Sequence, residues 1–299
     1  MINHYFSQFL MFDHIAQPIS YQHIELSFPV HLDIKRLDLV HPQISGNKFF
    51  KLKYNLLAAK EQGLSSILTF GGAYSNHIAA TAYAAHLFGL KSIGIIRGEE
   101  LAGKPLNPTL AKAQSLGMQL HFVSRHEYRL RDDANYLQQF PQTYIIPEGG
   151  SNELAVQGCQ EILSQYDLEQ YDVICCAVGT GGTISGLIER SAAHQKVLGF
   201  SALKGDFLQQ AIRQWTKKQN WSLTDVYCWG GYAKTSPELF AFIENFEEQY
   251  TLPLEPIYTG KMMFGLFELI KNNYFPENTR ILAIHSGGLQ ADIRNKPHT

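Results

Sequence analysis

Short apolar runs alternate with longer helical patterns along this chain from about Ser65 onward, and this alternation constrains the fold more than any other feature of the sequence. Each apolar run suits a strand, and each helical pattern is long enough to cross over to the next strand. The first series predicts strands over 66–70, 92–96, 119–123 and 143–146, with helices over 76–87, 107–115 and 132–139. Such alternation predicts a parallel sheet with helices on both faces.

A second series of the same kind follows. It predicts strands over 173–178, 197–203, 225–229 and 280–285, with helices over 184–193, 206–217, 237–249 and 264–272. Two doubly wound units with a cleft between them are the simplest architecture. We expect residues 1–60 and 150–299 to form the larger domain, and residues 61–149 to form a smaller inserted α/β domain. Ligands of such folds bind outside the carboxyl ends of the strands.

The composition is that of an ordinary globular enzyme and argues against other classes of protein. The 299 residues carry a formal net charge of -2 without a long run of like charges, which argues against a nucleic-acid-binding face. No apolar run approaches the ~18 residues that a membrane-spanning helix needs. Residues Met1–Phe6 lack the basic and apolar regions of a signal peptide. We therefore expect a cytoplasmic protein that binds neither nucleic acid nor a membrane.

The cysteine and histidine patterns predict neither a disulfide framework nor a metal site. Two of the four cysteines, Cys175 and Cys176, are neighbours inside an apolar run, which is typical of buried thiols. Paired CxxC spacing is missing, and the twelve histidines show no HExxH arrangement. We expect no bound metal.

Lys48 is the first candidate for chemistry, because a glycine-containing turn leads directly into the apolar helical pattern that carries it. It lies in the run 45–52 (SGNKFFKL). A lysine sheltered from bulk water can lose its proton near neutral pH and attack a carbonyl to form a Schiff base. Most lysines are solvated surface charges, so Lys48 gains weight only together with the segments below.

Two glycine-containing loops follow predicted strands and precede predicted helices. In residues 71–77 (GGAYSNH), Ser75 or Asn76 can cap the helix, and the free N–H groups at its start can hold a carboxylate. A capped helix without a ligand is an equal alternative for this loop. In residues 179–183 (GTGGT), the glycines let successive N–H groups converge on a phosphate, and both threonines can add hydroxyl donors. Phosphate binding is the better interpretation of this second loop.

Two nucleotide-binding motifs are incomplete in this sequence. The loop 179–183 lacks the GxGxxG spacing of dinucleotide sites, and the next predicted strand ends at Leu203 and Lys204 without an acidic residue for a ribose hydroxyl. Residues 98–105 resemble an NTPase phosphate loop, but Pro105 replaces the Ser or Thr that would bind magnesium. A nicotinamide-dependent oxidoreductase therefore remains only an alternative.

Two more segments near the C-terminus carry polar groups at turns. The predicted strand 280–285 ends at Ser286, and the two glycines after it would let a flat ring lie close to the backbone. Tyr258 lies at a turn after a proline-containing segment. A buried tyrosine is more often part of the core than of a catalytic site, so Tyr258 adds little by itself.

Together these motifs resemble those of the pyridoxal-phosphate enzymes of the tryptophan synthase β fold, fold type II. They are most similar to the family of 1-aminocyclopropane-1-carboxylate deaminase and D-cysteine desulfhydrase. The resemblance runs from about Asp33 to Gly288. It rests on five ordered motifs, which are 45–48 (SGNK), 71–77 (GGAYSNH), 179–183 (GTGGT), 258–261 (YTGK) and 285–288 (HSGG). Five motifs in order are far more specific than any one of them.

The resemblance implies a role for each motif. Lys48 is expected to bind the cofactor's aldehyde and to move the proton at the substrate Cα. The other cofactor contacts are expected from Asn76 to the ring hydroxyl, from Gly179, Thr180, Gly181, Gly182 and Thr183 to the phosphate, and from Ser286 to the pyridine nitrogen. Ser75, Asn76 and His77 are expected to hold the substrate carboxylate. Ser75 and Tyr258 are grouped with Lys48 as catalytic, Tyr258 as an acid-base or positioning group.

Thr259 distinguishes two branches of the family that this chain resembles. Ring-opening deaminases carry a glutamate at this position, whereas the desulfhydrase branch carries a threonine and a hydroxyl at the strand end, as Thr259 and Ser286 provide here. A neutral hydroxyl stabilises a protonated pyridine less than a carboxylate does, and this suits the loss of a β-substituent.

The predicted function is that of a pyridoxal 5'-phosphate-dependent lyase acting on a small amino acid, namely a D-cysteine desulfhydrase that forms pyruvate, ammonia and hydrogen sulfide. A homodimer is expected from the same resemblance. The alternatives are a 1-aminocyclopropane-1-carboxylate deaminase, another β-eliminating lyase, a non-catalytic relative, and the oxidoreductase named above.

Overall fold

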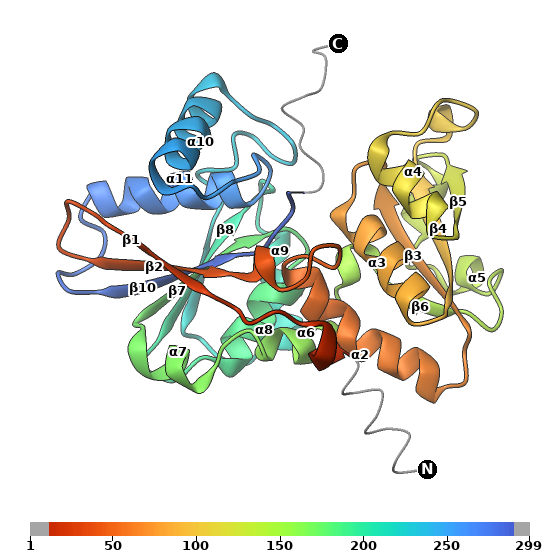
Figure 1. The fold of residues 1–299 in the computed structure, drawn as a ribbon, viewed down its shortest axis with the longest axis horizontal. Helices are drawn as coiled ribbons and strands as arrows, with labels where there is room; N and C mark the ends of the chain where they lie inside the picture. The colour runs from red at the N-terminus through yellow and green to blue at the C-terminus, as the bar shows by residue number, and fades with distance from the viewer. Residues whose placement is uncertain (1–11, 290–299) are drawn as a thin grey trace.

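The computed structural model describes residues 12–289, and the chain forms two lobes, each built around one sheet (Figure 1). The strands of the large sheet lie in the order β1-β2-β10-β7-β8-β9. Strand β1 is antiparallel to β2, and all other neighbours are parallel. The strand bounds are Tyr21–Ile24 (β1), His31–Arg36 (β2), Val173–Val178 (β7), Lys196–Ser201 (β8), Trp221–Thr224 (β9) and Arg280–His285 (β10).

The small sheet has four parallel strands in the order β5-β4-β3-β6. Their bounds are Ser66–Gly72 (β3), Lys91–Arg97 (β4), Met118–Val123 (β5) and Tyr144–Ile146 (β6). All four lie between residues 61 and 149, while the strands of the large sheet come from both flanking segments. These two sheets confirm the predicted α/β class with mainly parallel sheets. We propose the predicted ranges as the limits of the two domains.

Helices cover both faces of the large sheet, because successive side chains of the fully buried strand β7 pack into two different cores. Val173 and Cys175 pack into one core with the helices on their side, whereas Ile174 and Cys176 pack into the other. The helices are α2 (Asn47–Glu61), α3 (Asn76–Leu87), α4 (Pro108–Ser115), α5 (Ala134–Leu137), α6 (Glu153–Gln160), α7 (Gln165–Gln170), α8 (Gly182–Arg190), α9 (Phe207–Trp215), α10 (Pro237–Tyr250) and α11 (Thr259–Lys271). Short 3-10 turns span Leu37–Leu39 (η1), Glu99–Leu101 (η2), Glu127–Leu130 (η3) and Glu148–Gly150 (η4).

Helix α2 connects the two lobes. It packs against α6 and α8 of the large lobe and against α3 of the small lobe, and Figure 1 shows it beneath their junction. Lys48, the second residue of α2, therefore lies where the lobes meet.

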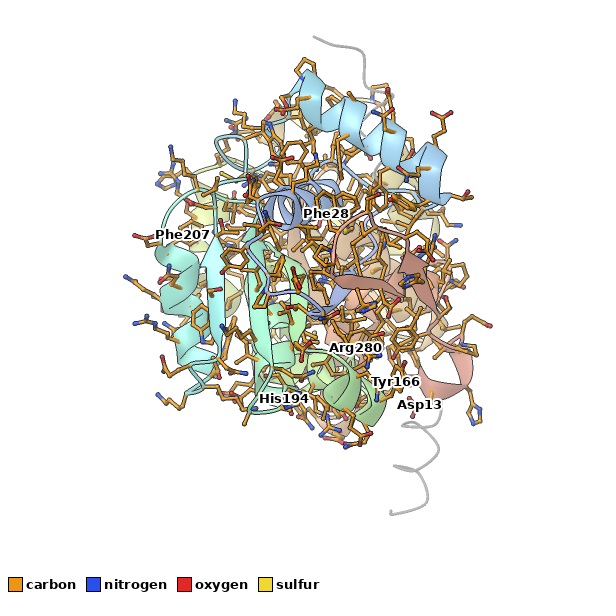
Figure 2. All side chains as sticks on the ribbon, turned by 90° about the vertical axis from the view of Figure 1, so that its left-hand side faces the viewer. Asp13, Phe28, Tyr166, His194, Phe207 and Arg280 are labelled. Carbon is orange, nitrogen blue, oxygen red and sulfur yellow. The ribbon has the colours of Figure 1, made fainter. Side chains whose placement is uncertain are left out.

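The carboxyl ends of the large sheet face the small lobe. Figure 2 views the opposite side of the large lobe and labels Arg280, the first residue of β10, together with His194 and Tyr166, which precede β8 and β7. The amino ends of these parallel strands therefore point away from the small lobe. The loops after β7 and β10 point toward it, where ligands of such folds bind.

One predicted strand is wrong. The edge strand β9 occupies Trp221–Thr224, and residues 225–229 form a turn instead. Trp229 has a φ of 51° and Gly230 one of 86°, values that no strand allows. The buried amine of Lys261 donates to the carbonyls of Cys228 and Gly231 at 2.8 and 2.9 Å, so these carbonyls bind an ammonium group rather than a neighbouring strand.

Other boundaries differ from the prediction by a few residues. Helix α11 begins at Thr259 rather than at residue 264, which places Tyr258 at its N-cap. The motif 258–261 therefore begins a helix. Strands β1 and β2 and helices α6 and α7 were not predicted; charged residues interrupt the apolar pattern of β2 and α7.

Residues Met1–Phe6, which bear on the signal-peptide argument, lie outside the described range. Within residues 12–289, no helix is long and apolar enough to cross a membrane.

Candidate active site

The start of α2 packs directly on the loop after β10. Gly46, the N-cap of α2, has a φ of 67°, and a Cβ atom added there would lie 1.9 Å from the carbonyl oxygen of Ser286. The N–H of Asn47 donates to that same oxygen at 3.1 Å. Only glycine fits at position 46, both in conformation and in space. This contact brings Lys48 and Ser286, which are 238 positions apart in the sequence, to the same place.

The Lys48 amine lies in surroundings that favour its neutral form. Its Nζ donates to the side-chain oxygen of Asn47 at 3.0 Å. Burial and, to a smaller extent, the charge of Lys51 lower the pKa of Lys48 to about 7, against the opposite effects of Cys159 and Glu255. A substantial fraction of the amine is therefore unprotonated at neutral pH and can act as a nucleophile or as a base.

The loop after β7 forms a cradle at the start of α8. Gly181 adopts the left-handed conformation as the N-cap of α8, and no side chain caps this helix. A Cβ atom added at Gly182 would lie 2.8 Å from the Ser151 hydroxyl oxygen and 3.4 Å from the Lys51 amine. The side chain of Asn47 donates to the hydroxyl of Thr183 at 2.9 Å. The helix that carries Lys48 is thus tied to this loop.

Lys51 is a site residue that the sequence reasoning missed. Its amine donates to the carbonyl of Gly149 at 2.9 Å and to the hydroxyl of Ser151 at 2.8 Å, and it lies 3.4 Å from the hydroxyl of Thr180. The residue is 2% exposed, and burial lowers its pKa to about 8. A buried cation beside the start of α8 forms a site for an anion. The signal in the sequence was its spacing of three residues from Lys48, which places both on one helix face.

The loop after β3 brings the small lobe into the site. Ser75 caps α3, its hydroxyl accepting the N–H of Ile78 at 3.3 Å. The side-chain oxygen of Asn76 is buried and has no hydrogen-bond partner among the described residues. The amide nitrogen of Asn76 would lie 3.2 Å from a Cβ atom added at Gly288. The loops after β3 and β10 therefore meet, and an acceptor at their meeting point is left open for a ligand.

The His77 side chain points into the protein. It is 2% exposed, and its Nε2 lies 2.8 Å from the Thr69 hydroxyl. That hydroxyl donates to the carbonyl of Ile146, so Nε2 must carry the proton and donate to Thr69. Burial and the charges of Lys48 and Lys51 hold the pKa of His77 well below 6.5. The neutral ring leaves Nδ1 as a bare acceptor, so only the backbone N–H of His77 could contribute to holding a carboxylate.

Two tyrosines lie together over the loop after β7. A Cβ atom added at Gly179 would lie 2.9 Å from a ring carbon of Tyr258 and 3.3 Å from its hydroxyl oxygen. The rings of Tyr258 and Tyr232 are 6.1 Å apart. Burial raises the pKa of Tyr258 well above 10, and Tyr232 and Glu255 raise it further, so the phenol keeps its proton at neutral pH. Sequence reasoning missed Tyr232 because it lies in the segment after the wrongly predicted strand.

The structure thus brings the predicted segments to one place through four close approaches. These join Gly46 to Ser286, Asn47 to Thr183, Gly179 to Tyr258, and Asn76 to Gly288. The His77 imidazole lies near Lys48 and Lys51, but its Nε2 is bound to Thr69 and its neutral ring offers no second donor. The site therefore contains an amine that favours its neutral form, a loop that can bind an anion, two tyrosine phenols and an amide oxygen without a hydrogen-bond partner.

Comparison with known proteins adds independent findings. The family described as "Pyridoxal-phosphate dependent enzyme" matches residues 29–287. A putative 1-aminocyclopropane-1-carboxylate deaminase of Thermotoga maritima is 33% identical over 281 residues, which cover 86% of this chain and 88% of that protein. A bifunctional D-cysteine desulfhydrase/1-aminocyclopropane-1-carboxylate deaminase of Arabidopsis thaliana is 31% identical over 86% of this chain and 72% of its own length.

A solved structure shows the same fold. The crystal structure of an ACC deaminase homologue aligns with a TM-score of 0.80 at 24% identity, covering 96% of this chain and 95% of the other.

Proposed function

Because this chain belongs to the family of pyridoxal-phosphate-dependent enzymes, we propose that the site just described binds pyridoxal phosphate and eliminates the β-substituent of a small amino acid, with D-cysteine as the substrate. The observation that best supports this proposal is the convergence of three groups from both lobes. They are the Lys48 amine, the anion cradle at 179–183 and the unpartnered side-chain oxygen of Asn76. The overall reaction converts D-cysteine and water into pyruvate, ammonia and hydrogen sulfide.

The residues present fit the cofactor. Lys51, Thr180 and the start of α8 would hold the phosphate, since a buried cation and uncapped helix N–H groups suit an anion. The unpartnered oxygen of Asn76 would meet a polar group of the ring. Ser286, which follows the last residue of β10, would face the pyridine nitrogen. Glycines at 46, 182 and 288 let the segments that carry these residues approach one another closely.

Bound pyridoxal phosphate supplies an electron-withdrawing ring that makes the Cα–H bond of an attached amino acid acidic. Lys48, with a pKa of about 7, would accept the Cα proton. The start of α3, with the hydroxyl of Ser75, would hold the substrate carboxylate through N–H donors and the helix dipole. Tyr258 keeps its proton at neutral pH and would donate it to the leaving sulfur atom.

The environment of residue 259 supports β-elimination over ring opening. Thr259 is fully buried, and its hydroxyl contacts the carboxylate of Glu255 at 3.2 Å. A glutamate, the residue of the ring-opening branch, would be larger than this buried space provides and would place a second negative charge beside Glu255. The alternative, deamination of 1-aminocyclopropane-1-carboxylate, draws its support from the name of the Thermotoga maritima relative.

Absorption spectroscopy and product assays test the proposal. The purified protein with added pyridoxal phosphate should gain a violet absorption band, which Lys48→Ala abolishes and Lys60→Ala, at the far end of the same helix, retains. Pyruvate release should be fastest with D-cysteine in a panel that contains L-cysteine, D-serine and 1-aminocyclopropane-1-carboxylate. Faster release from the cyclopropane substrate would favour the alternative, and a wild-type protein that gains no band would refute the proposal.

A further inference from the structure

Glu255 is a buried carboxylate immediately before the Tyr258 turn. The residue is 4% exposed. One of its oxygens accepts the N–H of Ile257 at 2.7 Å, and the other accepts those of Tyr258 at 2.8 Å and Thr259 at 2.6 Å. Tyr258 is the N-cap of α11, but its own side chain makes no capping hydrogen bond. The carboxylate of Glu255 therefore caps α11 in its place, satisfying N–H groups that the helix leaves open.

The same carboxylate lies where three segments of the site meet. A Cβ atom added at Gly288 would lie 3.1 Å from Cγ of Glu255 and 3.2 Å from the amide nitrogen of Asn76. The carbonyl of Glu255 accepts the N–H of Gly260 at 2.8 Å, which closes the turn from its other side. Glu255 is thus enclosed by the Tyr258 turn, by the loop after β10 and by the start of α3.

The charge of Glu255 also reaches the Lys48 amine. Burial raises the pKa of Glu255, while the three backbone N–H donors and the Thr259 hydroxyl act against that rise. The carboxylate in turn raises the pKa of Lys48. Lys51, His77 and Cys159 also face Lys48, and a change at position 255 leaves all three in place.

We propose that Glu255 is a positioning residue, whose carboxylate holds the Tyr258–Thr259 turn against the loop after β10 and so aims the phenol of Tyr258 at the reacting molecules. This inference rests on the proposed function. A glutamine cannot replace the carboxylate, because both oxygens accept N–H groups and an amide would turn its own N–H₂ toward one of them. An aspartate keeps the charge but has a shorter reach.

The test compares Glu255→Gln with Asp167→Asn. Asp167 is a second buried carboxylate that caps a helix, α7, by accepting the N–H of Ser164 at 2.8 Å. It lies in the same helix as Tyr166, on the face of the large lobe away from the small lobe (Figure 2). Asp167→Asn therefore reproduces the loss of a buried capping charge without touching the site.

We expect Glu255→Gln to lower kcat by about 10- to 100-fold, with KM changed much less, because a misplaced catalytic group affects the reaction step more than binding. In the apoprotein, the pH midpoint for labelling of Lys48 by an amine-reactive reagent, followed by mass spectrometry, should move to lower pH, since a negative charge beside the ammonium group is lost. Asp167→Asn should change neither quantity. Glu255→Asp should keep the labelling midpoint of wild type and restore part of kcat, and it replaces Glu255→Gln if that variant does not fold.

The inference is overturned if Glu255→Gln retains the kcat of wild type, or if Asp167→Asn lowers kcat to the same extent. A shifted Lys48 midpoint with the kcat of wild type would show an effect on the Lys48 charge alone and would likewise overturn the positioning role. The labelling measurement needs no cofactor and no turnover. If wild type neither binds pyridoxal phosphate nor releases pyruvate, the proposed function has failed, and the midpoint alone still decides whether Glu255 acts on the Lys48 amine.

Discussion

Lys48 and Lys51 lie one turn apart on α2, yet their surroundings suit them to different tasks. The Lys51 amine is held by a carbonyl and two hydroxyls, whereas Lys48 has one amide oxygen as its hydrogen-bond partner. A lysine held in place suits the binding of an anion, and a less constrained neutral amine suits chemistry. Sequence reasoning found Lys48 from its motif. The spacing from Lys48 places Lys51 on the same helix face, but its partners are 98, 100 and 129 positions away, so its role could not be predicted.

Replacing Lys51 by Met should weaken cofactor binding without abolishing chemistry. A hydrogen bond between charged groups contributes about 1.5–3 kcal/mol, so the Kd for pyridoxal phosphate should rise by about 10- to 100-fold. Binding of pyridoxal, which lacks the phosphate, should change little. Titrations followed by absorbance measure both constants, with Lys60→Met as the control on the same helix. An equal loss for both ligands would show that Lys51 does not bind the phosphate.

The lowered pKa of Lys48 predicts how its reaction with an aldehyde depends on pH. Lysine is reactive when unprotonated, and the pKa of about 7 means that the neutral form predominates above that pH. The rate at which the apoprotein captures pyridoxal phosphate should therefore rise through pH 7 and level off above it, rather than keep rising toward pH 10.5. Stopped-flow absorbance across this range measures the profile. A rate that still rises steeply at pH 9 would contradict the assignment.

At the scale of helices and strands, the apolar runs were sufficient to predict β3, β4, β5, β7, β8 and β10. Strand β2 was missed because Lys35 and Arg36 break its pattern, although the structure pairs Lys35 with Asp167, more than a hundred positions away. The strand predicted at 225–229 was wrong because of another distant partner, since the buried amine of Lys261 binds that segment. The pattern of neighbouring residues does not show which distant residue will bind a charged side chain.

Gly46→Ala should be far more damaging than Gly63→Ala, although both glycines lie at either end of α2 with nearly the same φ, 67° and 68°. An alanine with positive φ costs about 1–2 kcal/mol, which is the whole expected effect at Gly63, where nothing lies within 4 Å of an added Cβ atom. Gly46 combines its positive φ with a ψ of -146°, a conformation essentially restricted to glycine. At Gly46 the clash with Ser286 adds a cost of about 1–3 kcal/mol or more, as overpacking does. Urea unfolding measures both, and equal losses would contradict the close approach.

At the scale of the whole molecule, the site belongs to neither lobe alone. The small lobe supplies Ser75 and Asn76, the large lobe supplies the 179–183 loop, Tyr258 and Ser286, and α2 connects them. The sequence predicted this general arrangement because strand-helix alternation places loops at the carboxyl ends of both sheets. It could not predict the direct contacts between the lobes. The homodimer expected from the resemblance remains a prediction, which sedimentation analysis would test.

Binding of pyridoxal phosphate should stabilise both lobes together. At a concentration of 100 Kd, a ligand that binds only the folded state adds about 2.7 kcal/mol to its stability. Amide hydrogen exchange should slow in β3 of the small lobe as well as in β7 and β10 of the large lobe. Lys51→Met at the same cofactor concentration should show less protection in both lobes. Protection confined to the large lobe would show that Asn76 and Ser75 take no part in binding.

The contact between Gly46 and Ser286 also bears on how the protein matures. Lys48 precedes Ser286 by 238 positions, so it leaves the ribosome well before the segment that fixes the first turn of its helix. A nascent chain that stops before residue 286 would contain Lys48 but would lack the contact that fixes the first turn of α2. The ability to bind pyridoxal phosphate should therefore arise only once β10 has joined the sheet.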